Sequence, residues 1–342
     1  MSAANRKVVL ASRPSGYPVE SNFRVEESQV PEVSVGEFLV RNAYVSLDAG
    51  FRNWMNEGSG DDVLPAMAIG APVMGLTLGQ VVASRNDAYR EGEWLMARLA
   101  WEEYSLSDGA DFISRLPEPR NWPLAHYLGV LGDTGLSAYF GLLDIGKPQP
   151  GETVLVSAAG GAVGNVVGQI ARIQGARAVG IAGTDEKCER LVAELGFDAA
   201  VNHRSVDLAA EIAAACPEGV HVYFDSVGGP LLETVLAQIA EKARIVMCGA
   251  VTAYNAIDPS PGPNNLFQLV TRQALMQGYL THLSEHRYTE ARAVIAQWLS
   301  DGKLKNVEYR LQGIDQVGRA FCDLFDGRNF GKTIVQLHDE AP

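Results

Sequence analysis

The chain has 342 residues, of which 47% are hydrophobic and 20% are charged. This length predicts about two domains, and the composition excludes wholesale disorder because it supplies enough apolar side chains to build cores. There are 28 Lys and Arg residues against 41 Asp and Glu, so the formal net charge is −13. Such an acidic chain is not expected to bind nucleic acid or an anionic membrane surface.

The four cysteines are too far apart for a disulfide scaffold or a zinc knuckle; they are Cys188, Cys216, Cys248 and Cys322. No long apolar segment follows Arg6-Lys7, so we expect no signal peptide. The uncharged stretches 63–84 and 153–171 are interrupted by Gly, Pro or polar residues, which argues against membrane-spanning helices. A cytoplasmic protein is therefore expected.

The first 120 residues predict a β-rich region, because short apolar runs alternate with Pro, Gly, Asn and Asp turns. From about residue 129 to 302, strand patterns alternate with helical patterns. We expect strands at 153–159, 177–182, 199–201, 221–225 and 243–248, and helices at 163–174, 185–195, 207–215 and 231–240.

Repeated β–α alternation is typical of a doubly wound parallel sheet with helices on both faces. Strand patterns return at 307–311 and 332–337, after a helix at 317–324. The predicted fold class is therefore α/β. We expect a Rossmann domain at 130–302, inserted into a β-rich domain made from 1–129 and 303–342.

A glycine-rich turn follows the apolar strand and opens the helix at 163–174. Its residues Gly161, Ala162, Val163 and Gly164 belong to an A-x-x-G-x-x-G pattern. A strand, a glycine turn and a helix form the context of a dinucleotide site, because the helix N-terminus offers free N–H groups to a pyrophosphate. The alternative is a structural turn without a ligand.

The end of the second strand distinguishes NAD from NADP. An NAD site usually places Asp or Glu there, but this chain has Gly183-Thr184. Lys187 could pair with a 2′-phosphate, or be a solvated surface lysine. Asp185 and Glu186 weaken the phosphate interpretation, and their alternative role is to cap that helix. His203 follows the next strand. It either contacts the same phosphate or the adenine, or is an ordinary surface histidine.

Several further strings carry a family resemblance across essentially the whole chain. They are Leu128-Gly129-Val130-Leu131-Gly132, Gly135-Leu136-Ser137-Ala138-Tyr139, Gly183-Thr184-Asp185-Glu186-Lys187, Asp225-Ser226-Val227-Gly228-Gly229, Cys248-Gly249-Ala250 and Gly331-Lys332-Thr333-Ile334-Val335. Together they resemble the zinc-independent medium-chain dehydrogenase/reductases, nearest to the leukotriene hydroxydehydrogenase, prostaglandin reductase and curcumin reductase group.

The resemblance implies an NADPH-dependent reductase of the carbon–carbon double bond in α,β-unsaturated ketones and aldehydes. It also implies a GroES-like catalytic domain, no metal and a homodimer. The resemblance also implies the NADP(H)-binding residues, with Lys187 at the 2′-phosphate and His203 where the family has a tyrosine. The others are Ser137, Gly161, Ala162, Val163, Gly164, Gly183, Val227, Cys248, Gly249, Ala250, Tyr254, Tyr279, Leu280 and Asn329.

The implied substrate cleft contains Phe51, Arg52, Tyr254 and Tyr279. Here the chain departs from the family, because Asp48-Ala49-Gly50-Phe51-Arg52 stands where the family often has Asp-Pro-Tyr-Met-Arg. Asp133 is also an unusual residue for its position. Both departures change residues near the expected reaction centre.

Enone reduction requires a hydride at the β-carbon, stabilisation of the carbonyl oxygen and a proton at the α-carbon. We expect Tyr254 to donate to that oxygen directly or through a ribose hydroxyl; alternatively it packs on the cofactor. A catalytic zinc is not expected, since no cysteine precedes Gly129 and His126 is the only histidine there. The rival functions are a zinc-free NADPH quinone oxidoreductase and a noncatalytic NADPH-binding protein.

Overall fold

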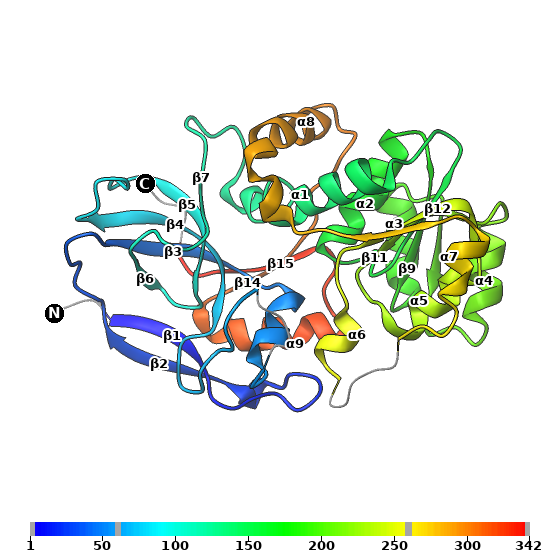
Figure 1. Cartoon of the computed structure of the whole chain (residues 1–342). Helices are drawn as coiled ribbons and strands as arrows, with labels where there is room; N and C mark the ends of the chain where they lie inside the picture. The colour runs from blue at the N-terminus through cyan, green and yellow to red at the C-terminus, as the bar shows by residue number, and fades with distance from the viewer. Residues whose placement is uncertain (1–3, 59–62, 257–261, 339–342) are drawn as a thin grey trace. The chain divides into compact units, whose positions relative to one another are not determined.

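The computed structural model describes residues 4–58, 63–256 and 262–338. The chain forms two compact units, coloured along the sequence in Figure 1. The first unit is Met1–Leu128, Glu308–Arg328 and Thr333–Pro342, and the second unit is Gly129–Val307 and Asn329–Lys332.

These units assign 303–307, 329–332 and Gly129 differently from the boundaries expected above. Side-chain contacts explain the first difference, because Lys305 N–H donates to Gln169 Oε1 at 2.8 Å. Gln169 Nε2 donates in return to the Lys305 carbonyl at 3.2 Å. The segment after the last helix of the second unit is thereby attached to that unit.

The first unit is β-rich, as expected. Its larger sheet has the order β14-β15-β3-β4-β5-β7, with β6 paired to β3, and β1 pairs with β2. The elements are β1 Ala4–Leu10, β2 Phe23–Gln29, β3 Phe38–Ser46, β4 Met74–Ser84, β5 Trp94–Ala100, β6 Tyr104–Ser107, β7 Ile113–Arg115, β14 Glu308–Gln312, α9 Val317–Asp326 and β15 Lys332–Gln336.

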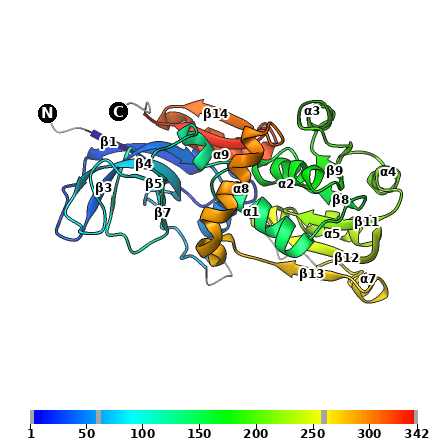
Figure 2. The ribbon, with the colours of Figure 1, turned by 90° about the horizontal axis from the view of Figure 1, so that it is seen from above.

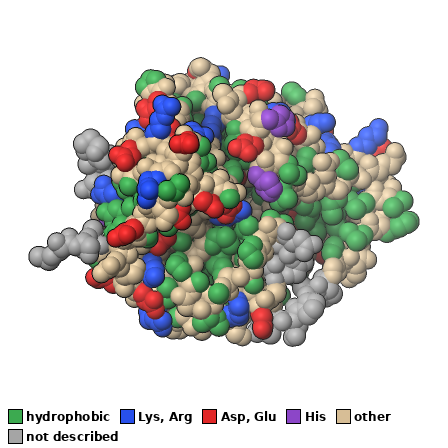
Figure 3. All heavy atoms as spheres, turned by 60° about the vertical axis from the view of Figure 1, so that its left-hand side comes forward, with side chains coloured by type: hydrophobic (Ala, Val, Ile, Leu, Met, Phe, Trp, Pro, Cys, Tyr) green, Lys and Arg blue, Asp and Glu red, His purple; other side chains and the backbone are tan. Residues whose placement is uncertain are grey.

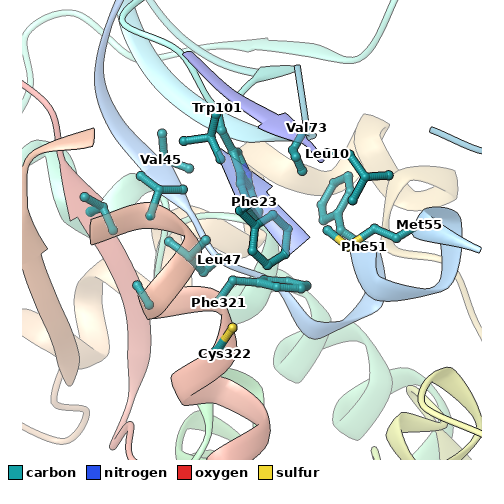
Figure 4. Packing of buried hydrophobic residues seen from close by; sticks show 14 of the residues in the cluster. Leu10, Phe23, Val45, Leu47, Phe51, Met55, Val73, Trp101, Phe321 and Cys322 are labelled. Carbon is teal, nitrogen blue, oxygen red and sulfur yellow. The ribbon is translucent and has the colours of Figure 1, made fainter. Parts of the chain in front are cut away.

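Aromatic rings from distant segments form the core of the first unit (Figure 4). The rings of Phe23, Trp101 and Phe321 pack with centroids 5.2 to 5.8 Å apart. Phe321 comes from α9, so the C-terminal helix completes a core begun by the N-terminal strands. This burial explains why the two chain ends form one unit.

The second unit contains a parallel sheet of order β10-β9-β8-β11-β12-β13. Its elements are α1 Asp133–Phe140, β8 Thr153–Val156, α2 Ala162–Ile173, β9 Arg177–Ala182, α3 Asp185–Leu195, β10 Ala199–Asn202, α4 Leu208–Ala215, β11 Val220–Asp225, α5 Gly229–Leu236, β12 Ile239–Met247, α6 Val251–Tyr254, α7 Phe267–Thr271, β13 Leu275–Gly278 and α8 Tyr288–Ser300.

Burial explains why these strands read as continuous apolar runs. All four residues of β8 are buried, as expected for a parallel strand that is covered on both faces. On one face, Leu155 and Tyr223 share a cluster with Ile212 of α4 and Leu232 of α5. Strand order reverses between β8 and β11, which is where open α/β sheets bind ligands.

The expected helix at 231–240 is wrong at its C-terminal end. α5 ends at Leu236, and β12 already begins at Ile239 rather than at residue 243. Ile239 is buried and pairs with Val220 of β11. Lys242 has a positive φ of 58° within β12, and the β11–β12 register shifts between Val220 and Val222. This irregularity obscures the strand pattern in the sequence.

Candidate functional site

The expected cofactor residues of the second unit follow the carboxyl ends of its parallel strands. Gly161 comes after β8, Gly183 after β9, His203 after β10, Val227 after β11 and Cys248 after β12. Tyr279 follows β13 in the same way. Because parallel strands end at one edge of the sheet, these residues share the edge at which dinucleotides bind.

The glycine turn has the shape that an anion-binding helix start requires. Gly161 N–H donates to the Ala158 carbonyl at 2.8 Å, and α2 then begins with Ala162 and Val163. A Cβ on Gly164 would lie only 2.5 Å from the Ala158 carbonyl oxygen. The absence of a side chain at Gly164 therefore permits α2 to pack closely on the turn after β8. No side chain caps α2, so an anion is a suitable partner for its first N–H groups.

A segment from the end of the chain braces this turn. Gly331 N–H donates to the Gly160 carbonyl at 2.8 Å, and Gly331 forms a parallel bridge with Gly161. The buried Asn329 side chain donates to the Gly331 carbonyl at 3.2 Å. Asn329 thus lies beside the glycine turn, where it supports the turn, and its contact with a cofactor stays a prediction.

Lys187 lies in the first turn of α3, beside the same glycine turn. Its Cδ lies 3.4 Å from the position that a Cβ on Gly160 would take, and Thr184 caps the helix by accepting Lys187 N–H at 3.2 Å. The half-buried Lys187 forms no ion pair with a carboxylate of the described residues. Burial lowers its pKa, as do the positive charges of Arg190 and Arg204. A phosphate would supply the missing negative partner.

The neighbouring charges are already engaged. Asp185 accepts a hydrogen bond from Asn202 Nδ2 at 2.7 Å. Arg190 donates to both Glu194 carboxylate oxygens at 2.7 and 3.1 Å, and its guanidinium stacks 3.9 Å from the centre of the Phe330 ring. Asp185 therefore acts in the link between α3 and β10, and Lys187 is the α3 cation best placed for an incoming anion.

His203 lies against Gly183. Its backbone N–H donates to the Ala182 carbonyl at 2.9 Å, and its Nε2 lies 3.3 Å from the position that a Cβ on Gly183 would take. Partial burial of the imidazole lowers its pKa, and the positive charge of Arg204 adds to this effect. The imidazole thus stands beside the place where an NAD site has its carboxylate.

The buried carboxylate of Asp225, which was not among the predicted site residues, organises the turns after β11 and β12. Asp225 ends β11 with 0% exposure, and its Oδ1 accepts from Ser157 Oγ, Tyr223 Oη, Val227 N–H and Gly228 N–H at 2.9 to 3.0 Å. Its backbone carbonyl accepts from the two residues after β12, Cys248 and Gly249. The signal in the sequence was a charged residue at the end of an apolar strand.

The turn after β12 holds Tyr254. Ala250 N–H donates to Tyr254 Oη at 3.1 Å, and a Cβ on Gly249 would lie 3.2 Å from that oxygen. The Tyr254 phenol is therefore placed at the carboxyl end of β12, next to Cys248-Gly249-Ala250. Whether it also serves in chemistry stays a prediction.

Tyr279 is fixed by its hydroxyl group. Tyr279 Oη donates to the Ser137 carbonyl at 2.8 Å, and Ser137 Oγ lies 2.5 Å from Thr281 Oγ1. Burial raises the pKa of Tyr279 well above its usual value, and burial raises the pKa of Cys248 to about 11. At neutral pH both groups are protonated. Leu280, in contrast, is 46% exposed.

Phe51 and Arg52 lie in a 3-10 helix, Ala49–Met55, of the first unit. Phe51 packs in the core shown in Figure 4. Arg52 is 1% exposed and donates to the carbonyls of Pro14 and Gly16 at 3.0 and 2.8 Å. Both side chains therefore stabilise the first unit, and their part in a substrate cleft stays a prediction.

Within residues 4–58, 63–256 and 262–338, no three His, Cys, Asp or Glu side chains are grouped so that they could hold a metal ion. None of the helices in this part of the chain has the length and apolarity needed to cross a membrane. On the face drawn in Figure 3, acidic and basic side chains are interspersed.

Comparisons with known proteins agree with this architecture. Residues 6–114 match the family described as N-terminal domain of oxidoreductase, and residues 162–297 match that described as zinc-binding dehydrogenase. The chain is 38% identical over 340 residues to the NADPH-dependent curcumin reductase of Escherichia coli (strain K12), with 97% of each chain covered.

The chain is also 34% identical over 342 residues to the NADP(+)-dependent 2-alkenal reductase of Nicotiana tabacum, with 98% of each chain covered. The crystal structure of CurA from Vibrio vulnificus in complex with NADPH matches with a TM-score of 0.90 at 39% identity, and covers 98% of this chain and 99% of that one. The chain belongs to the medium-chain dehydrogenase/reductases, in the zinc-independent group that contains curcumin and alkenal reductases. The resemblance found in the sequence is confirmed.

Proposed function

We propose that the protein is an NADPH-dependent reductase of the carbon–carbon double bond in α,β-unsaturated ketones and aldehydes. The observation that carries this proposal is the unpaired, half-buried Lys187 beside a glycine turn and a strand end without a carboxylate. Family membership supports the reaction class, since the curcumin and alkenal reductases are relatives over nearly the whole chain.

The residues at this edge fit NADP(H). The first turn of α2 would hold the pyrophosphate, while Lys187 and His203 would hold the 2′-phosphate. The turns after β11 and β12, which contain Val227 and Cys248, would line the nicotinamide half of the cofactor. When bound, NADPH supplies the hydride that the β-carbon of the substrate accepts.

Tyr254 is the proposed donor to the carbonyl oxygen of the substrate. Ala250 N–H donates to the phenol oxygen, which orients the ring so that the phenol O–H can act as the donor to a developing enolate. A positioned donor of this kind stabilises negative charge without a metal. Solvent can then supply the proton at the α-carbon.

The test is the loss of absorbance at 340 nm when the purified protein and NADPH meet a simple enone, with NADH and a quinone in parallel reactions. Turnover of the enone with NADPH, and little with NADH, is expected. Turnover of the quinone alone would establish the rival quinone oxidoreductase. Binding of NADPH without turnover of either acceptor would establish a noncatalytic protein.

A homodimer formed through the edge of the second unit is part of this proposal. β13 is the edge strand of its sheet, and Figure 2 shows it beside α7. Large apolar side chains are exposed on and near these two elements, and they are Leu266, Phe267, Val270, Leu275, Leu280 and Leu283. Such an edge favours pairing with a second copy. Light scattering of the wild type and of the Leu275→Lys variant tests this, and a monomeric wild type contradicts it.

We also propose a cytoplasmic location. The four cysteines are free thiols in the structure, which suits a reducing compartment. Fractionation of cells that produce the protein tests this location, and recovery with the membranes or outside the cell contradicts it.

A further inference from the structure

The ends of β9 and β10 place a histidine where a dinucleotide site reads the ribose. In the NAD-binding pattern, a carboxylate after the second strand binds the 2′-hydroxyl. Here Gly183 leaves that space open, and His203 Nε2 lies 3.3 Å from where the Gly183 Cβ would be. The Ala182–Asn202 pairing and the His203 N–H bond to Ala182 fix the histidine at this point. The His203 imidazole, which can gain a positive charge, thus stands where the NAD-binding pattern has a negatively charged carboxylate.

Arg204, in the same loop, is the charged group that acts on this imidazole. The neighbouring elements carry further titratable groups, which are Asp185, Glu186, Lys187 and Arg190 in α3, and Glu211 in α4. Three of them have partners, since Asp185 accepts from Asn202, Glu211 accepts from Ser205 and Arg190 pairs with Glu194. Arg204 is therefore the charge that acts on the free imidazole, and Lys187 is the α3 cation that forms no ion pair among the described residues.

We propose that His203 is a protonation-dependent reader of the 2′-phosphate, so that NADPH binding takes up a proton which NADH binding does not. This inference rests on the proposed use of NADPH. Lys187 supplies an ammonium group to the phosphate, whereas His203 supplies a positive charge only when a phosphate is present to stabilise it.

The direction of the pH effect follows from linkage. Without cofactor, burial and the positive charge of Arg204 lower the pKa of His203, which favours the neutral form of the ring. A phosphate dianion next to the ring raises this pKa, so affinity for NADPH falls as pH rises between the free and the bound value. The phosphate titrates with a pKa of about 6, and its deprotonation in a basic pocket acts in the opposite direction. Comparison with a variant that lacks only the imidazole separates the two effects.

The experiment is isothermal titration calorimetry of adenosine 2′,5′-bisphosphate into the full-length protein at pH 7, in two buffers with different ionisation enthalpies. The wild type is expected to take up more protons than His203→Gln, with a difference that approaches about one proton. Because one unit of pKa difference is about tenfold in affinity, we expect His203→Gln to bind roughly three- to tenfold more weakly. Adenosine 5′-monophosphate should show no difference between the two proteins.

Two further variants control this experiment. His203→Lys carries a permanent charge and should bind the bisphosphate tightly without extra proton uptake. His286→Gln alters an exposed histidine of the second unit and should behave as the wild type. Equal proton uptake in the wild type and His203→Gln would overturn the proposed role of His203. So would a loss of proton uptake in His286→Gln equal to that in His203→Gln. Neither result would affect the proposed use of NADPH. If the wild type binds the bisphosphate no more tightly than the monophosphate, the 2′-phosphate site itself fails, and the proposed use of NADPH fails with it.

Discussion

Gly331 N–H donates to the Gly160 carbonyl at 2.8 Å, which joins the last part of the chain to the glycine turn of the candidate cofactor site. Gly331 has a positive φ of 85°, and a Cβ there would lie 2.3 Å from the Val307 carbonyl oxygen. This position therefore requires glycine for two reasons. Its positive φ strains other residues, and the Val307 carbonyl leaves no room for a side chain.

Gly331→Ala is expected to lower the free energy of unfolding by about 1–3 kcal/mol, because of backbone strain together with the clash. NADPH binding should weaken too, since the brace of the glycine turn is displaced. Gly313→Ala is the matched control, with a φ of 87° and nothing within 4 Å of the added Cβ. Denaturant unfolding and NADPH fluorescence titration measure both effects. An equal loss of cofactor affinity in the two variants contradicts the bracing role.

Lys187→Ala is expected to weaken NADPH binding and leave NADH binding unchanged. Hydrogen bonds to charged groups contribute about 1.5–3 kcal/mol, so the loss in NADPH affinity should be roughly ten- to 100-fold. Lys303→Ala removes a lysine that pairs with Asp301 on the surface, and it should change neither affinity. A parallel loss of NADPH and NADH affinity in Lys187→Ala speaks against phosphate recognition.

Tyr254→Phe is expected to lower kcat for enone reduction while NADPH affinity is retained. The variant keeps the ring and removes the hydroxyl, so it tests donation to the carbonyl oxygen. Tyr279→Phe is the comparison, because it removes a hydroxyl that donates its hydrogen bond to the Ser137 carbonyl. Its effect should fall on thermal stability. Steady-state kinetics and thermal unfolding distinguish the two, and unchanged kcat in Tyr254→Phe leaves this tyrosine a packing role only.

Asp225→Asn is expected to destabilise the second unit, because an amide cannot accept every hydrogen bond that the carboxylate accepts from its four donor groups. Leaving buried donors unsatisfied costs about 1–3 kcal/mol. Tyr223→Phe removes one donor and should cost less. The measurement is denaturant unfolding of both variants. If Tyr223→Phe is the more damaging change, the carboxylate is not the centre of this network.

Glu102→Gln is expected to remove a pH dependence of stability from the first unit. Burial raises the pKa of Glu102, and hydrogen bonds from Ser105 and Asn5 oppose that shift. The folded chain thus holds this proton more tightly than the unfolded chain, so stability falls as pH rises from the ordinary carboxyl pKa to the raised value. Unfolding from pH 4 to 8 should show a smaller decline in the variant. Identical pH profiles would assign the dependence to other groups.

The alternation of strands and helices from residue 153 to 247 was predictable, because strands covered on both faces must be apolar and each helix needs one apolar face. The glycine turn was also predictable, since its shape depends on residues that are adjacent in the chain. The end of α5 was not, because Ile239 belongs to β12 through its pairing with Val220, which sequence periodicity does not contain.

The sequence by itself therefore determined the fold class, the family and the strand ends at which cofactor residues stand. Only the tertiary structure decided what those residues contact. It brought Gly331 to Gly160 and His203 to Gly183, and it made Asp225 a buried centre of hydrogen bonds. The physical reason is that periodicity and turn chemistry act between near neighbours, whereas these contacts depend on the burial and pairing of segments that are distant in the chain.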